Sequence, residues 1–222
     1  MKRLFLQYVC RIFRFAVALL TIASLAAKIA LAEGGIFTDL DAEKHSYCYD
    51  AVQWAHRQRI VEGVSVKSAT GEAELHFDPD STCSRAHIVT FLWRYAGRPE
   101  QSAEASFPDI NKSAYYYSAV LWASRNKIAL GYSDGKFKPG KGVSRGEAIT
   151  FLWRFAGMPD PKVAPMPFHD VLEGKIYYKA VLWGLQNGIT DGVSPEEFSP
   201  ESLCKRGHIA KYLYQYELSL SR

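Results

Sequence analysis

Three internal repeats constrain this chain more than any other feature of its sequence. Each repeat opens on a Phe-x-Asp tripeptide, at residues 37–39, 107–109 and 168–170. A helical Ala-Val-x-Trp segment follows, at 51–54, 119–122 and 180–183. Later in each repeat a turn phenylalanine precedes an arginine by eight positions, at 77 and 85, 137 and 145, and 198 and 206. This regularity predicts one small unit used three times, and units of this size need their neighbours to complete a core.

Each repeat predicts a helix, a turn and a second helix. Apolar residues at i, i+1 and i+4 around the tryptophan indicate the first helix. The second begins at the arginine, and in repeat 2 Ser144 and Glu147 have the spacing of a capping box. Ser84 keeps half of this box in repeat 1, whereas Lys205 and His208 replace both members in repeat 3.

The repeats are expected at residues 36–99, 104–160 and 165–220. Repeat 1 carries eight additional residues near 64–74, and their Ser, Lys, Thr and Gly content predicts a surface loop.

The first 32 residues are predicted to be a signal peptide. Basic residues come first, an apolar run covers residues 15–27, and Ala30-Leu31-Ala32 matches a small-x-small cleavage site. An uncleaved anchor helix is the alternative, but Lys28 interrupts the run before it reaches the roughly 20 apolar residues that a membrane span needs. We therefore expect an exported protein with no stable membrane span after cleavage.

The charge of the chain argues against nucleic-acid binding. Its net charge is +4, but five of its 27 basic residues lie in the predicted signal peptide, which contains no acid. The rest has 22 basic and 23 acidic residues, and a surface that follows phosphates needs a large positive excess.

These segments together resemble the S-layer homology (SLH) domain, normally found as three tandem copies in exported bacterial surface proteins. The resemblance covers residues 36–220 and rests on the Phe-x-Asp opening, the Trp-Ala pair, the turn at 131–139 and the Ser-Arg-x-Glu motif. It implies a mainly α fold, with three helix-loop-helix repeats in a pseudo-threefold assembly and short loop or strand segments between the helices. It also implies grooves between repeats that bind a secondary cell wall polysaccharide, often one carrying pyruvate ketals.

Three arginines are the candidate ligands for the carboxylate of such a sugar: Arg85, Arg145 and Arg206. An arginine in the first turn of a capped helix lies beside unpaired amides and the positive end of the helix dipole, and its guanidinium can hold a carboxylate through two hydrogen bonds. A salt bridge to a neighbouring repeat, for instance to its opening aspartate, would explain the same residues.

The other candidates fall into three groups. Trp54, Trp122 and Trp183 would either stack on sugars or fill the core, and Asp39, Asp109 and Asp170 would brace the start of each repeat, with ligand contact secondary. Repeat 2 has the most complete set, namely Gly131, Gly135, Ser144 and Glu147. We therefore expect Arg145 to contribute most to binding and Arg206 least.

The cysteines allow two interpretations besides simple burial. Cys48 and Cys83 could form a disulfide between the two helices of repeat 1. Cys83 and Cys204 each precede a histidine by four positions, as in helical metal sites, but repeat 2 has Val143 at this place, which favours a buried packing position. We expect no metal and no cofactor.

Two other classes of function remain open to different degrees. An enzyme is not expected, because no sequence pattern places two carboxylates opposite one another, and no nucleophile elbow or metal motif occurs. A module that binds another envelope protein is the stronger alternative. The repeats carry tyrosine runs at 115–117 and 177–178, and tyrosine is enriched at protein interfaces. In either case we expect a monomer whose three repeats pack on one another.

Overall fold

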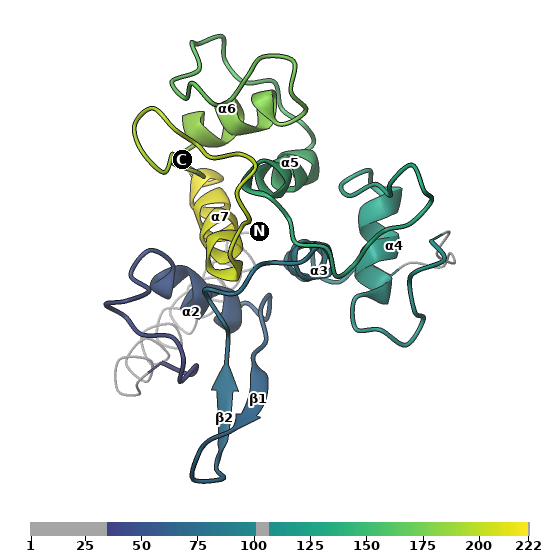
Figure 1. The fold of residues 1–222 in the computed structure, drawn as a ribbon, viewed down its shortest axis with the longest axis vertical. Coiled ribbons are helices and arrows are strands. Elements are labelled where there is room, and N and C mark those ends of the chain that lie inside the picture. Colours follow the sequence, from purple (N-terminus) through teal and green to yellow (C-terminus); the bar gives the residue numbers. More distant parts are fainter. Residues whose placement is uncertain (1–34, 101–106, 222) are drawn as a thin grey trace, which may run out of the picture.

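The protein is mainly helical, and its helices form three lobes around a common centre (Figure 1). The computed structural model describes residues 35–100 and 107–221. The predicted signal peptide therefore lies outside the described residues, as do the first residues of repeat 2. Within the described part, no helix has both the length and the apolar character needed to cross a bilayer.

The first helix of each repeat has nine residues: α2 (Tyr49–Arg57), α4 (Tyr117–Arg125) and α6 (Tyr178–Gln186). The second helices are α3 (Arg85–Tyr95), α5 (Arg145–Phe155) and α7 (Arg206–Ser219). The second helices lie nearer the centre of the molecule and the first helices farther out (Figure 1). The predicted helix-turn-helix pattern is confirmed.

The helices that pack most closely come from different repeats. Helix α3 of repeat 1 packs on α4 of repeat 2, α5 on α6 of repeat 3, and α7 on α2 of repeat 1. Each lobe is thus built from the second helix of one repeat and the first helix of the next. The third pair joins the two ends of the chain and closes the circle.

A ring of backbone hydrogen bonds closes one end of the assembly. Cys83 N donates to Cys204 O (2.8 Å), Cys204 N to Val143 O (2.8 Å), and Val143 N to Cys83 O (2.9 Å). All three side chains are fully buried. Since each repeat supplies one donor and one acceptor, the ring requires all three repeats to be present.

An aromatic cluster fills the centre where the second helices end. Tyr95, Phe155 and Tyr216 occupy equivalent positions in the three repeats, and each ring contacts the other two at centroid distances of 5.6 to 6.1 Å. The helical tryptophans pack around this triangle. The high aromatic content of the chain therefore serves the core first.

The additional residues of repeat 1 form a β-hairpin rather than the expected loop. Strand β1 (Val64–Lys67) pairs antiparallel with β2 (Ala73–His76), in a register that sets Val64 opposite His76. Strand β1 alternates valine with polar residues, a pattern that a short exposed hairpin tolerates. The hairpin projects from the lobe that contains α2 (Figure 1).

Candidate functional site

The turn before each second helix is held by the opening aspartate of its own repeat. In repeat 2, the Asp109 carboxylate accepts from Phe137 N (2.9 Å) and Lys138 N (2.7 Å). Asp39 and Asp170 accept the equivalent pairs of amides at 2.6 to 2.9 Å. Burial raises the pKa of Asp109, but the backbone hydrogen bonds outweigh burial and hold the pKa below its usual value.

The helix-start arginines hold the same turns from the other side. Arg85 Nε donates to Phe137 O (2.9 Å) and its Nη2 to Leu130 O (2.6 Å), while Arg145 donates equivalently to Phe198 O (2.8 Å) and Asp191 O (3.0 Å). Arg206 Nε donates to Phe77 O (2.9 Å). Each turn is therefore clamped by its own aspartate and by the arginine of the preceding repeat in the circle.

Because of these contacts, the arginines are structural parts of the turns. They are buried, with 3 to 7% of each residue exposed, and their partners are backbone carbonyls rather than the opening aspartates. The turn of repeat 2 is served by Arg85 and not by Arg145, which reaches into repeat 3. Burial lowers the pKa of Arg85 and Arg206 from its ordinary value.

The helix starts do not offer unpaired amides, so that part of the expected carboxylate site is wrong. In repeat 2, Arg145 N donates to Ser202 O (2.8 Å) and Gly146 N to Pro200 O (2.8 Å) of repeat 3. The first two amides of α3 and α7 are paired in the same way. The dipole of each helix is thus met by carbonyls of the adjacent repeat.

The capping boxes follow the expected pattern in two repeats and depart from it in one. Ser144 and Glu147 form the complete box at α5, and no side chain caps α7. At α3 the box is also complete, because His87 Nδ1 accepts from Ser84 N (3.3 Å) in place of a carboxylate. Burial and then the charge of Arg206 lower the pKa of His87 to about 4, which keeps this nitrogen available as an acceptor.

The turn of repeat 2 (residues 131–141) presents an aromatic ring surrounded by cations. The Tyr132 ring has the Arg85 guanidinium at 4.8 Å, the Lys138 ammonium at 4.5 Å and the Lys141 ammonium at 4.8 Å from its centroid. Lys141 also donates to the Tyr132 hydroxyl (3.0 Å). Both lysines remain substantially exposed, but Lys138 is paired with Asp134 (2.9 Å) and Lys141 lies 3.8 Å from Glu147, so an anionic ligand would compete with these carboxylates for the basic turn.

The two glycines expected to shape this turn do so for different reasons. Gly135 has a φ of +72°, which favours glycine. A Cβ on Gly131 would lie 2.5 Å from the Phe107 ring, so the absence of a side chain there allows the opening phenylalanine to pack against the turn.

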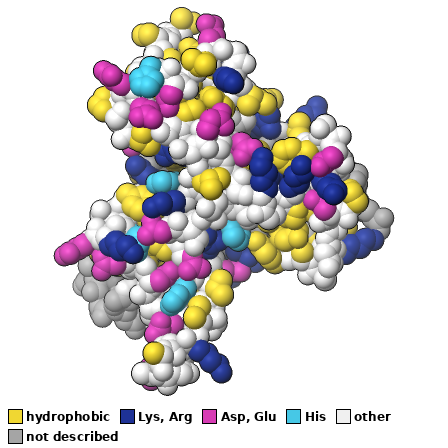
Figure 2. Space-filling model, in the orientation of Figure 1, with side chains coloured by type: hydrophobic (Ala, Val, Ile, Leu, Met, Phe, Trp, Pro, Cys, Tyr) yellow, Lys and Arg dark blue, Asp and Glu magenta, His cyan; other side chains and the backbone are white. Residues whose placement is uncertain are grey.

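The corresponding turns of the other repeats carry different charges. Repeat 3 has Val193, Ser199 and Ser202 where repeat 2 has Tyr132, Lys138 and Lys141, and it adds three glutamates at 196, 197 and 201. Repeat 1 has histidine and aspartate at 76 and 78. Figure 2 shows the result as Lys and Arg side chains gathered on the lobe with α4, against acidic and His side chains near the hairpin.

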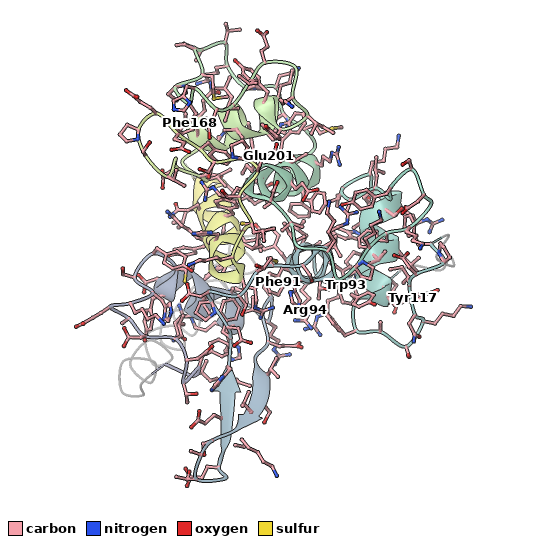
Figure 3. The ribbon with its side chains drawn as sticks, viewed as in Figure 1. Phe91, Trp93, Arg94, Tyr117, Phe168 and Glu201 are labelled. Carbon is pink, nitrogen blue, oxygen red and sulfur yellow. The ribbon has the colours of Figure 1, made fainter. Side chains whose placement is uncertain are left out.

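The tryptophans divide between core and surface. Trp122 and Trp183 are buried at 6% exposure, whereas Trp54 is partly exposed. Trp54 lines an open depression of about 360 Å³ together with Arg94, Tyr95 and Glu217. Arg94 lies on α3 near the centre of the molecule (Figure 3), and its Nη2 contacts Glu62 Oε2 at 2.7 Å.

Sequence reasoning assigned no role to Arg94, Tyr95 or Glu217. Arg94 ends a Phe-Leu-Trp-Arg segment that recurs at 151–154, and an aromatic residue follows it in both repeats, so this recurrence was a usable signal. Glu217 lies in the last part of α7, beyond the point where the equivalent helices α3 and α5 end, and its carboxylate accepts from the Tyr95 hydroxyl of α3.

The predicted Cys48–Cys83 disulfide is wrong for this structure. Among the described cysteines, Cys48, Cys83 and Cys204 are all free thiols and all buried. Cys83 lies in the closing ring, whereas Cys48 packs against α7, where its Sγ lies 2.7 Å from the place a Cβ on Gly207 would take. Burial raises the pKa of all three thiols, to about 11 for Cys48 and about 12 for Cys204.

The tyrosine runs considered for a protein partner differ in exposure. Tyr115 is exposed, but Tyr177 is buried, and its hydroxyl donates to Glu201 Oε1 (3.1 Å). The two runs therefore do not form equivalent surfaces.

Comparison with known proteins identifies two of the repeats. Residues 106–149 and 167–210 match the S-layer homology domain family. The chain is 33% identical over 113 residues to the Surface-layer 125 kDa protein of Lysinibacillus sphaericus, and 25% identical over 137 residues to the Cellulosome-anchoring protein of Acetivibrio thermocellus. These alignments cover 50% and 59% of this chain.

The relatives are much longer than the aligned region. The matched part spans 9% of the surface-layer protein and 31% of the cellulosome-anchoring protein. An Endo-1,4-beta-xylanase A of Thermoanaerobacterium saccharolyticum matches at 28% identity over 119 residues, which is 53% of this chain and 9% of the xylanase.

Proposed function

Because the chain contains S-layer homology domain segments, we propose that it is a non-catalytic module that anchors to a bacterial cell wall at the cell surface. Residues 36–99 are, in this proposal, a third repeat of the same kind. The equivalent aspartate and arginine clamps in all three turns support this extension, since repeat 1 both supplies and receives them. Cleavage after Ala32 would separate the exported module from its signal peptide.

We propose an acidic polysaccharide of the wall, of which a pyruvylated polymer is one case, as the ligand. The observation that carries this proposal is the basic turn of repeat 2, where two exposed lysines flank the Tyr132 ring. An aromatic ring offers a flat surface to a sugar, and ammonium groups attract carboxylates. The buried Arg85 adds positive charge beneath the ring.

The residues expected as direct ligands take a different part in this proposal. Arg145, Arg206 and the opening aspartates build the grooves, because each is buried or partly buried and hydrogen-bonded to the backbone of a turn. Trp54, beside Arg94, offers a second place for a sugar ring. The turn of repeat 3, with its three glutamates, would repel an acidic polymer.

Sedimentation of the protein with purified cell walls tests the proposal. The informative variant is Lys138→Ser with Lys141→Ser, because it converts the basic turn to the residues of repeat 3. Loss of two contacts to a charged ligand should weaken wall affinity by at least roughly tenfold. The matched control, Lys67→Ala with Lys175→Ala, removes the same charge from exposed positions elsewhere and should bind normally.

Walls stripped chemically of their polysaccharide provide the second arm. Binding that disappears on stripping supports the polysaccharide. Binding that persists on stripped walls, or that the double lysine variant leaves unchanged, would refute the proposal and favour a protein partner in the envelope.

A further inference from the structure

The turn of repeat 1 gathers three groups that can ligate a metal ion. Asp39, His76 and Asp78 each offer one ligand atom, and these atoms all lie within 4.8 Å of one another. Two of these groups are partly buried, and Asp78 is exposed. Tetrahedral ligands at about 2 Å from a common ion are roughly 3.3 Å apart, so the side chains would have to rotate toward one another by an ångström or so on binding.

The cluster is specific to repeat 1. Repeat 2 has Lys136 and Lys138 at the positions of His76 and Asp78, and those lysines would exclude a cation from the same place beside Asp109. His76 is also the last residue of β2, so the inserted hairpin delivers it to the turn. The residues that distinguish this turn from the basic turn are thus the ones that could hold a metal.

The surroundings of the cluster suit a bound cation. Glu74 Oε2 lies 3.1 Å from His76 Nε2, and a carboxylate on one ring nitrogen is the usual partner of a histidine that binds metal through the other. Each Asp39 oxygen accepts one backbone amide and retains a lone pair. Arg206 interacts with both Asp39 and Asp78, but the three carboxylates still exceed its single charge.

We propose that Asp39, His76 and Asp78 form a binding site for a divalent transition-metal ion, with Zn²⁺ as the ion that fits one imidazole and two carboxylates. Imidazole favours Zn²⁺ over Ca²⁺ and Mg²⁺, which prefer oxygen ligands alone. A water completes the tetrahedron, while Glu74 holds the other ring nitrogen of His76. The bound ion would fasten the end of the hairpin to the start of repeat 1, and this site is independent of the proposed wall binding.

Calorimetric titration of the untagged, chelator-treated protein with ZnCl₂ tests the site. We expect one ion per chain. Asp78→Asn should weaken binding at least tenfold, and His76→Lys with Asp78→Lys, which copies repeat 2, should abolish it. His169→Ala, which removes an exposed histidine of repeat 3, should bind as the wild type does.

The melting temperature of each variant without metal shows whether the variant folds normally, so a loss of Zn²⁺ binding can be separated from a loss of folding. Asparagine tolerates the φ of +57° at position 78, so Asp78→Asn should melt normally. With Zn²⁺, only the wild type and His169→Ala should gain in melting temperature. Absence of Zn²⁺ binding, binding that survives the double lysine change, or binding of Ca²⁺ without Zn²⁺ would each overturn the proposal.

Discussion

Replacing Arg145 with alanine should lower the stability of the whole assembly more than replacing Arg206. Arg145 donates two side-chain hydrogen bonds to carbonyls of repeat 3, and its guanidinium lies 4.6 Å from the centre of the Phe198 ring. Arg206 makes one such bond in the described structure, to Phe77 O. Both arginines are almost completely buried, so water replaces these bonds poorly.

The size of the effect follows from the number of bonds lost. A hydrogen bond to a charged group contributes about 1.5 to 3 kcal/mol, so Arg145→Ala should cost about 3 to 6 kcal/mol and Arg206→Ala about half of that. For a chain of this length each kcal/mol lowers the melting temperature by roughly 2 to 4 °C. We therefore expect Arg145→Ala to melt roughly 6 to 24 °C below the wild type.

Differential scanning calorimetry and wall sedimentation should be run on the same samples. Arg145→Lys keeps the charge but loses the planar fork, so it should fall between wild type and alanine. Lys175→Ala, at an exposed position, is the control for loss of one charge. A normal melt of Arg145→Ala together with lost wall binding would refute the clamp and restore this arginine as a direct ligand.

Three further predictions concern single residues. His87→Glu, which copies the glutamate of repeat 2, should flatten the fall in stability between pH 6.5 and about 4. The folded pKa of this histidine lies below its unfolded value, so stability is complete above pH 6.5 and falls toward pH 4 because the unfolded chain binds a proton that the folded cap excludes. Urea unfolding across this range measures the fall. Tyr212→Phe should raise stability by about 1 kcal/mol, because no described residue hydrogen-bonds the buried hydroxyl and both other repeats have phenylalanine there. An unchanged or lower urea midpoint would contradict this. A thiol reagent should leave Cys48, Cys83 and Cys204 unmodified in the native protein and label all three after denaturation without a reductant. Two cysteines that stay unlabelled in the denatured protein would show a disulfide.

The local features of this protein could be predicted from its sequence. The apolar faces of the helices and the Ser144–Glu147 cap depend on residues close together in the chain, and the structure confirms both. Val143 at the position of two cysteines correctly indicated buried packing. The bracing role of Asp109 was likewise predicted, although its two amide partners were not.

Which repeat each residue contacts was decided only by the tertiary structure. Every repeat presents the same turn and the same arginine, so sequence spacing alone cannot distinguish a contact within a repeat from one to the next. The closing ring resolves this ambiguity, because it carries each second helix into the adjacent repeat and so pairs Arg85, rather than Arg145, with the basic turn. The packing of α2 on α7 likewise sets Cys48 against Gly207 of α7. Trp54 is more exposed than the other two tryptophans. Local patterns specify helices and caps, whereas the choice among three equivalent partners depends on how the chain closes on itself.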